Sequence, residues 1–292
     1  MDINYELYKV FYHVATTLSF SEASRRLFIS QSAVSQSIRS LEKKLNQKLF
    51  IRSTKKVKLT PAGELLLKHI EPAMNLIKRG EEQILDTMNL GQLHIAASDT
   101  ICRYFLVPYL KRFHEMYPDV PIKVTNATSL ACADLMRQGK VDLVFTNTPN
   151  SRLDEDSISR VVCKFKDVFV ASEKAFSLKD KTIALKELTE YPILMLDRKS
   201  TTSEYLHDIF LKHQLELVPQ IELSSNDLLM DLAKIGLGIA FVPDYMLSST
   251  VKDIYSLKIK ETIPERQIVV AVNTSLPQLP STEKFLQLLP SL

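Results

Sequence analysis

Residues 20–45 constrain the fold most strongly, because they combine helical periodicity with a high density of small polar side chains. The stretch reads FSEASRRLFISQSAVSQSIRSLEKKL. Its second half has apolar residues at helical steps, which predicts a helix with one buried side: Val34, Ile38, Leu41 and Leu45. We expect Ser21 to cap a first helix and Ser30 to cap the second, with the break FIS between them.

The opposite face of the second helix is a row of hydrogen-bonding groups: Gln31, Ser32, Ser35, Gln36, Arg39 and Lys43. Ser and Gln side chains suit base edges and phosphates in the major groove, and Arg suits guanine or phosphate. Two helices with a tight turn and an exposed polar face on the second predict a helix-turn-helix. A solvated surface without a partner is the alternative for this face taken alone.

Charge is distributed unevenly along the chain. Residues 1–60 hold eleven Lys or Arg and four Asp or Glu, a net charge of +7, whereas the whole chain carries +3. The remaining residues therefore carry −4, and the basic segment suits a polyanion. The next segment, LFIRSTKKVKLTPAG, alternates as two short strands around the cationic turn 53–56, which predicts a wing that touches the DNA backbone or minor groove.

The N-terminal segment resembles the DNA-binding domain of LysR-type transcriptional regulators. The similarity covers ATTLSFSEASRRLFISQSAVSQSIRSLEKKLNQKLFIRSTKKVKLTPAGELLL, and it is most specific in the recognition helix, the LFIR strand and the LTPAG exit. It implies a winged helix-turn-helix that binds operator or promoter DNA. The candidate DNA-binding residues are Ser21, Gln31, Ser32, Ser35, Gln36, Arg39, Lys43, Arg52, Ser53, Lys55 and Lys56.

Residues 61–90 predict one long helix with an apolar stripe that a single helix cannot bury. Its apolar residues include Leu65, Ile70, Ile77 and Ile84. The family resemblance implies a linker helix that pairs two chains in a homodimer or homotetramer. An intramolecular helical hairpin is the competing interpretation.

From residue 91 onward, strands alternate with helices, which is typical of α/β folds with parallel sheets. The predicted strands include LHIAAS, PIKVTNA, DLVFTN, PILMLD, VPQIEL and GIAFVP, with helices near 101–117, 129–138, 203–213 and 227–235. The resemblance implies a doubly wound, two-lobed effector domain similar to periplasmic binding proteins. We expect lobe I at 91–162 and 267–292 and lobe II at 163–266, after a DNA-binding domain at 1–60.

Three predicted strand-to-helix junctions are rich in hydroxyl groups, at residues 98–100, 128–129 and 200–203. Ligands of open α/β sheets bind beyond the carboxyl ends of strands, where helix N-termini favour anions, although helix capping alone explains many such residues. The resemblance implies ligand contacts at Ser98, Thr100, Ser129, Thr146 and Thr202, and the hydroxyl-rich junctions add Thr128 and Thr201 to the candidate effector-binding residues. The stretch FTNTPNSR has no clear counterpart of a carboxylate-holding arginine. We therefore expect a polar or anionic metabolite less acidic than a dicarboxylate.

Enzymatic and membrane functions find no support in the sequence. GLGIAF lacks the third glycine of a nucleotide-binding loop, and no GxSxG, HExxH or Walker motif occurs. We expect no metal, no cofactor, free cysteines and no membrane segment, and the absence of a signal-like start favours the cytoplasm. A ligand-controlled transcriptional regulator that contacts RNA polymerase is the prediction. A transport solute-binding protein, supported only by residues 91–292, is the alternative.

Overall fold

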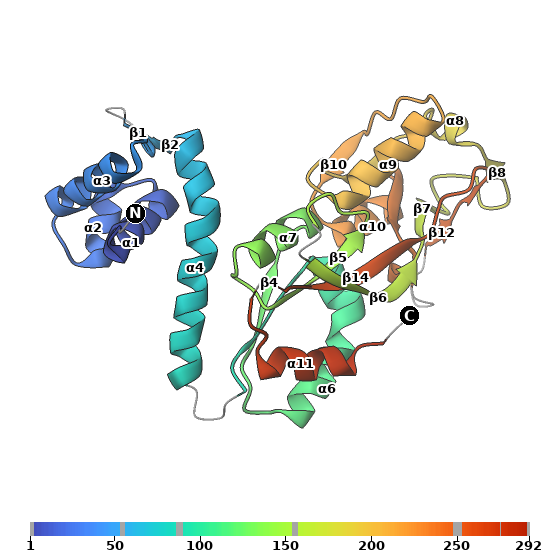
Figure 1. Cartoon of the computed structure of the whole chain (residues 1–292). Coiled ribbons are helices and arrows are strands. Elements are labelled where there is room, and N and C mark those ends of the chain that lie inside the picture. The colour runs from blue at the N-terminus through green and yellow to red at the C-terminus, as the bar shows by residue number, and fades with distance from the viewer. Residues whose placement is uncertain are drawn as a thin grey trace. The chain divides into compact units, whose positions relative to one another are not determined.

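The computed structural model describes residues 3–52, 56–85, 90–153, 157–247, 253–274 and 276–290. The chain forms two compact units (Figure 1), of which the first contains the N-terminal helices and the second begins with β3. Among the described residues, no helix is both long enough and apolar enough to span a bilayer.

The first unit is a helix-turn-helix with a two-stranded wing and a long helix. Its elements are α1 (Tyr5–Thr17), α2 (Phe20–Leu27), α3 (Gln31–Leu45), β1 (Phe50–Arg52), β2 (Val57–Leu59) and α4 (Pro61–Leu85). The predicted apolar stripe of α3 is its buried side, since Val34, Ile38 and Leu41 pack into one core with α1 and α2. This arrangement confirms the predicted winged helix-turn-helix.

Capping of the first two motif helices differs in one position from the prediction. Ser30 caps α3, and its Oγ accepts the N–H of Ala33 at 3.1 Å, as expected. The prediction that Ser21 caps α2 is wrong, because the Oγ of Ser19 accepts the N–H of Glu22 instead. Phe20 is buried as the first residue of α2, so the helix begins before Ser21.

The wing is fastened to α3 by a buried carboxylate. Oε1 of Glu42 accepts the backbone N–H of Leu49 at 2.9 Å and of Phe50 at 3.3 Å, and Oε2 accepts the Lys48 ammonium. These bonds satisfy backbone donors where the chain leaves α3 and enters β1. Glu42 thus sets the position of the wing relative to the recognition helix.

Helix α4 begins at Pro61, whose fixed φ suits the first turn of a helix. Two glycines within α4 have opposite surroundings. A Cβ at Gly63 would lie 2.2 Å from the carbonyl oxygen of Leu49, whereas a Cβ at Gly80 would meet nothing within 4 Å. Gly63 therefore permits the close approach of α4 to the start of the wing.

We expect Gly63→Ala to lower the free energy of unfolding of the first unit by about 1–3 kcal/mol, because the added methyl group displaces backbone. Gly80→Ala is the matched control, and it should raise stability by about 0.5–1 kcal/mol through helix propensity. Urea unfolding of the full-length variants, followed by far-UV circular dichroism, measures both. Equal effects of the two substitutions would contradict the close packing at Gly63.

The second unit contains two mixed five-stranded sheets, one in each lobe. The first lobe has strand order β4-β3-β5-β14-β6, and the second has β10-β9-β11-β7-β12. The first sheet consists of β3 (Leu93–Ala97), β4 (Ile122–Asn126), β5 (Leu143–Thr148), β6 (Ser157–Phe165) and β14 (Arg266–Asn273). The second consists of β7 (Asp167–Ser172), β9 (Ile193–Leu196), β10 (Ile221–Leu223), β11 (Ile239–Pro243) and β12 (Ile254–Ser256). A separate parallel pair joins β8 (Thr182–Ile183) to β13 (Lys258–Ile259).

Three neighbouring strands of each sheet pair in parallel, as the alternation of strands and helices predicts, whereas β14 and β7 run antiparallel to both of their neighbours. These two strands lie where the chain crosses between lobes. The first crossing falls between Phe165 and Asp167, so Cys163 still belongs to β6 of the first lobe. The chain returns between Ile259 and Arg266.

Helices cover both faces of each sheet. In the first lobe, α6 (Val107–Met116) and α11 (Pro280–Leu288) pack on one face and α7 (Ser129–Arg137) on the other. In the second lobe, α8 (Leu185–Leu188) and α9 (Thr201–Lys212) cover one face and α10 (Asn226–Lys234) the other. The predicted helix at 101–117 begins earlier, with α5 (Asp99–Ile101) followed by a π-helical segment at Cys102–Leu106. A 3₁₀ turn, Asp244–Met246, follows β11.

Candidate functional site

The recognition helix α3 presents the predicted polar face to solvent. Gln31, Ser32, Gln36, Arg39 and Lys43 are exposed, and Ser35 is half-buried. Ser32 Oγ lies 2.8 Å from Ser30 Oγ, so its hydroxyl joins the cap of the helix. Gln36, Arg39 and Lys43 follow one another at helical steps and therefore share one face.

The wing contributes fewer described residues. Ser53 and Lys55 lie outside the described residues, and Lys56 directly precedes β2. The guanidinium of Arg52 lies over the Phe20 ring at 4.2 Å from its centroid, a cation–π contact. This contact orients Arg52 at the end of β1. Ser21 is exposed on α2.

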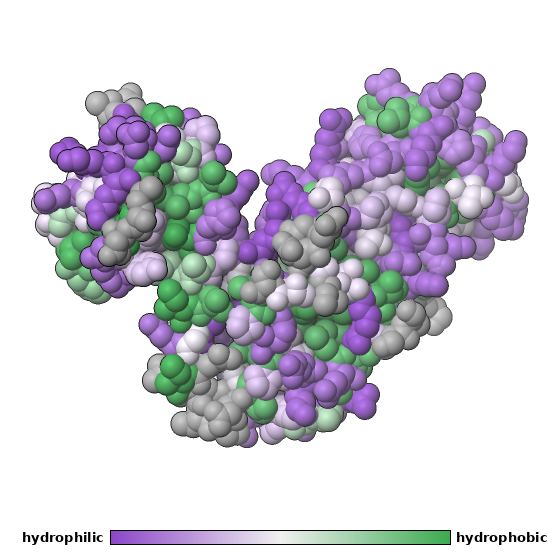
Figure 2. Space-filling view, in the orientation of Figure 1, coloured by the Kyte–Doolittle hydropathy of each residue, from purple (hydrophilic) through white to green (hydrophobic). Residues whose placement is uncertain are grey.

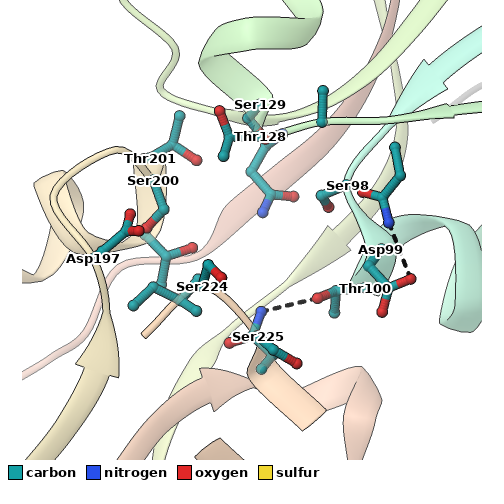
Figure 3. A pocket seen from close by; sticks show the side chains of 16 residues that line it. Ser98, Asp99, Thr100, Thr128, Ser129, Asp197, Ser200, Thr201, Ser224 and Ser225 are labelled. Atoms are coloured by element: carbon teal, nitrogen blue, oxygen red, sulfur yellow. Dashed lines mark hydrogen bonds between the residues drawn. The ribbon is translucent and has the colours of Figure 1, made fainter. Parts of the chain in front are cut away.

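A cavity of about 420 Å³ lies between the two lobes of the second unit (Figure 3). The starts of four helical runs line it: α5 and α7 from the first lobe, α9 and α10 from the second. Each start leaves backbone N–H groups without an intrahelical acceptor and carries a partial positive charge. The cavity thus brings together the three predicted hydroxyl-rich junctions.

Several of the predicted hydroxyls act as helix caps. Ser98 Oγ accepts the N–H of Ile101, and Thr128 Oγ1 accepts the N–H of Ala131. Ser200 and Ser225 cap α9 and α10 in the same way. The junction at 224–226 was missed by the sequence argument, although SSND after the predicted strand VPQIEL is the same kind of signal.

The end of β5 places Asn147, rather than Thr146, on the cavity wall. Thr146 is fully buried, accepts a bond from the Asn150 amide at 2.7 Å and does not line the cavity. Side chains alternate between the two faces of a strand, so neighbouring residues cannot both face the ligand. In this structure the side chain of Thr146 therefore does not line the cavity. Asn147 donates its backbone N–H to Ser129 Oγ at 3.2 Å, which ties β5 to the start of α7.

Helix α10 of the second lobe is tied to the first lobe beside the cavity. The amide of Asn226 donates to Thr100 Oγ1 at 2.9 Å, and both side chains are buried (Figure 3). The hydroxyl of Tyr104 donates to Asp227 Oδ1 at 2.7 Å. Burial, followed by this bond, raises the pKa of Tyr104 to about 12. Thr100 therefore has a partner from the opposite lobe.

Thr201 and Thr202, at the start of α9, receive hydrogen bonds from a buried arginine. Arg266 donates through Nη2 to Thr201 Oγ1 at 3.2 Å and through Nη1 to Thr202 Oγ1 at 3.0 Å. Because each hydroxyl oxygen already accepts a bond, its own proton remains available for an acceptor. The two threonines can therefore donate to an acidic group in the cavity.

Arg266 itself is paired at the crossing between the lobes. Its Nη1 lies 2.8 Å from Asp167 Oδ2, and its Nε donates to the carbonyl of Thr148 at 2.9 Å. The guanidinium also stacks near the rings of Tyr205 and Phe165. Burial raises the pKa of the Asp167 carboxyl, and the adjacent guanidinium acts in the opposite direction. The sequence signal for this buried ion pair was a single arginine directly before the apolar run QIVVAVN.

The three cysteines of the second unit have thiols whose pKa is raised by burial. All three are free, and burial raises the pKa of Cys102 to about 11 and of Cys132 to about 12, which disfavours thiolate formation. Within the part of the chain that the structure describes, no group of three or more His, Cys, Asp or Glu side chains is placed to hold a metal ion.

Comparison with known proteins decides the family. Residues 5–64 match the bacterial regulatory helix-turn-helix protein, lysR family, and residues 88–291 match the LysR substrate binding domain. The chain belongs to the LysR family of transcriptional regulators. Like other LysR regulators it is a DNA-binding protein with an effector-binding domain, and the family comprises regulators rather than enzymes. The matches lend no support to the transport solute-binding alternative.

Individual LysR relatives match over most of their length. The transcriptional activator CmpR of Synechocystis is 28% identical over 243 residues, which cover 82% of this chain and 79% of CmpR. A full-length OxyR variant from Pseudomonas aeruginosa has a TM-score of 0.69 at 18% identity, covering 99% of this chain and 94% of OxyR. CbnR in complex with its target DNA has a TM-score of 0.66 at 18% identity and covers 98% of each chain.

We expect Asp167→Asn to lower the free energy of unfolding of the effector domain by about 3–5 kcal/mol, because it leaves the Arg266 guanidinium buried without a counter-charge. The control is Glu115→Gln, which breaks an exposed pair with Lys111 and should cost less than about 1 kcal/mol. Chemical unfolding followed by intrinsic tyrosine fluorescence tests both. A loss below about 1 kcal/mol in Asp167→Asn would show that the pair is dispensable.

Proposed function

We propose that this LysR regulator reads operator DNA through α3 and the wing, dimerises through α4, and binds a small polar effector in the cavity between its two lobes. The supporting observation is the cavity itself, where helix N-termini from both lobes converge in a chain that also carries a helix-turn-helix. The corresponding segments are residues 1–60, 61–90 and 91–292, and within the last the chain crosses between lobes at 165–167 and at 259–266.

The effector acts by favouring one arrangement of the lobes. A ligand shifts a conformational equilibrium only by its difference in affinity for the two states. The bonds Asn226–Thr100 and Tyr104–Asp227 join the lobes directly beside the cavity, so a ligand that contacts both lobes competes with or reinforces them. Paired DNA-binding units would then change their spacing on DNA, which couples effector and DNA affinities. We further propose that the DNA-bound regulator contacts RNA polymerase and works in the cytoplasm.

The assignment of α3 and the wing predicts two different defects. Gln36→Ala removes a base-reading amide and should cost about 1–3 kcal/mol of discrimination at one base pair. Lys56→Ala removes a phosphate contact, so it should weaken binding to all sequences alike and lower the salt dependence by about one counterion. Binding to a set of operator variants at several salt concentrations separates the two effects. Identical behaviour of the two variants would refute the assignment.

Apolar side chains on α4 support a dimer. Figure 2 shows hydrophobic side chains along this helix, and two large apolar residues of α4, Ile77 and Ile84, are seven residues apart and so share one face. Ile77 is 58% exposed and Ile84 is 86% exposed, although both are large and apolar. A stripe of this kind gains stability when a second helix covers it. The second copy of α4 is the partner that we propose.

We expect Ile77→Asp and Ile84→Asp to weaken dimerisation at least ~100-fold, because each buries an uncompensated charge in the helix pair. Lys68→Asp introduces the same residue on roughly the opposite side of α4, so it is the control and should leave the assembly intact. Analytical ultracentrifugation over a range of protein concentrations measures the dissociation constant. Unchanged association of both isoleucine variants would mean that the dimer forms elsewhere.

A further inference from the structure

The effector cavity has an unusual balance of charge for a site formed by helix N-termini. Its sixteen lining residues include two carboxylates, Asp99 and Asp197, and no Lys, Arg or His. Asp99 comes from the first lobe and Asp197 from the second, and they lie on opposite sides of the cavity in Figure 3. The buried Arg266 is not in the lining, and Asp167 neutralises it.

Each of the two carboxylates accepts a hydrogen bond from a neutral donor of the protein and has no cationic partner among the residues that the structure describes. Asp99 Oδ1 accepts the amide of Asn126 at 3.2 Å, and Asp197 Oδ1 accepts the backbone N–H of Lys199 at 3.0 Å. Within the described residues, no Lys or Arg forms an ion pair with either one. Asp99 also lies in the first turn of a helical run, which stabilises a carboxylate there. That effect does not apply to Asp197, which precedes the cap of α9.

A third feature points to a missing ligand. Asn147 lines the cavity and is only 7% exposed, and its side-chain Oδ1 accepts no hydrogen bond within the described part of the chain. A buried amide left unpaired is costly, since it loses water without gaining a partner. A ligand that donates a hydrogen bond to Asn147 Oδ1 would complete its hydrogen bonding, and an ammonium group is such a donor.

From these observations, and on the basis of the proposed function, we propose that the effector is a small polar amino acid. Its ammonium group would bind one of the two carboxylates, Asp99 or Asp197, and its carboxylate would accept hydrogen bonds from the starts of α7 and α9. A simple dicarboxylate leaves both aspartates facing a second negative charge, and an uncharged ligand leaves them unpaired. A ligand that carries both signs complements the helix N-termini with its carboxylate and the acidic lining with its ammonium group.

The lining also limits the side chain of this amino acid. Ala127 and Leu196 are the only apolar residues among the sixteen, so the wall offers little surface for an aliphatic or aromatic side chain. A volume of about 420 Å³ accommodates an amino acid of modest size together with water. We therefore expect serine, threonine, asparagine, glutamine, aspartate or glutamate rather than a large apolar amino acid.

Calorimetric titration of the full-length protein with these six amino acids, and with the 2-hydroxy acid that matches each one, tests the proposal. The hydroxy acid replaces the ammonium group with a hydroxyl and leaves the remainder of the molecule unchanged. At least one amino acid should bind, and its 2-hydroxy acid should bind about 10–100-fold more weakly. At least one of the variants Asp99→Asn and Asp197→Asn should weaken binding of the amino acid by a similar factor. Asp119→Asn and Asp208→Asn, exposed acids of the two lobes outside the cavity, should leave affinity unchanged.

The outcomes separate the ligand class from the location of the site. If a hydroxy acid binds as tightly as its amino acid, or if none of the six amino acids binds, the amino-acid proposal is wrong. Asn147→Ala tests the location, because this substitution removes a cavity amide whose Oδ1 has no protein partner within the described residues. If an amino acid binds and neither this variant nor the two cavity aspartate variants change its affinity, the cavity between the lobes is not the effector site. As a control for folding, the thermal unfolding and the DNA binding of every variant are measured alongside.

Discussion

The buried ion pair between Arg266 and Asp167 is the interaction on which the architecture of the effector domain depends. Arg266 begins β14 of the first sheet and Asp167 begins β7 of the second, so the pair joins the sheets where the chain crosses between lobes. A buried pair of this kind adds little stability over an apolar packing, but loss of one partner is expensive. Its contribution is therefore positional: it holds both crossings and the start of α9 in one geometry.

The effector cavity follows from that geometry. Arg266 does not line the cavity, but its guanidinium donates to the hydroxyls of Thr201 and Thr202, which do. The guanidinium that joins the two chain crossings therefore also orients these hydroxyls. The second link, between Asn226 and Thr100, lies at the cavity and joins the lobes through neutral groups. A ligand can replace a neutral hydrogen bond at a much lower free-energy cost than a buried ion pair. The ion pair at the crossing is thus suited to stay in place when a ligand binds, and the Asn226–Thr100 hydrogen bond is suited to break or re-form.

Local sequence signals predicted the DNA-binding unit almost completely. The stripe of Val34, Ile38 and Leu41, the cap at Ser30 and the strands of the wing depend on interactions between residues close together in the chain, where periodicity and capping are reliable. The prediction failed at Ser21, because the burial of Phe20 decided where α2 begins and capping preference did not. The role of Glu42 was also missed, since a buried carboxylate at a helix end looks like a surface acid in sequence.

The sequence by itself determined the type and order of the elements, the hydroxyl-rich strand ends and the basic head, because these depend on spacing and composition along the chain. It did not determine which of two neighbouring residues at the end of β5 faces the cavity, since Thr146 and Asn147 are both polar and only the orientation of the strand separates them. Tertiary structure alone brought Asp99 and Asp197 to one cavity and Arg266 to Asp167. The members of each pair are far apart in the sequence, and no local pattern encodes a contact that forms only when two lobes close on a shared crossing.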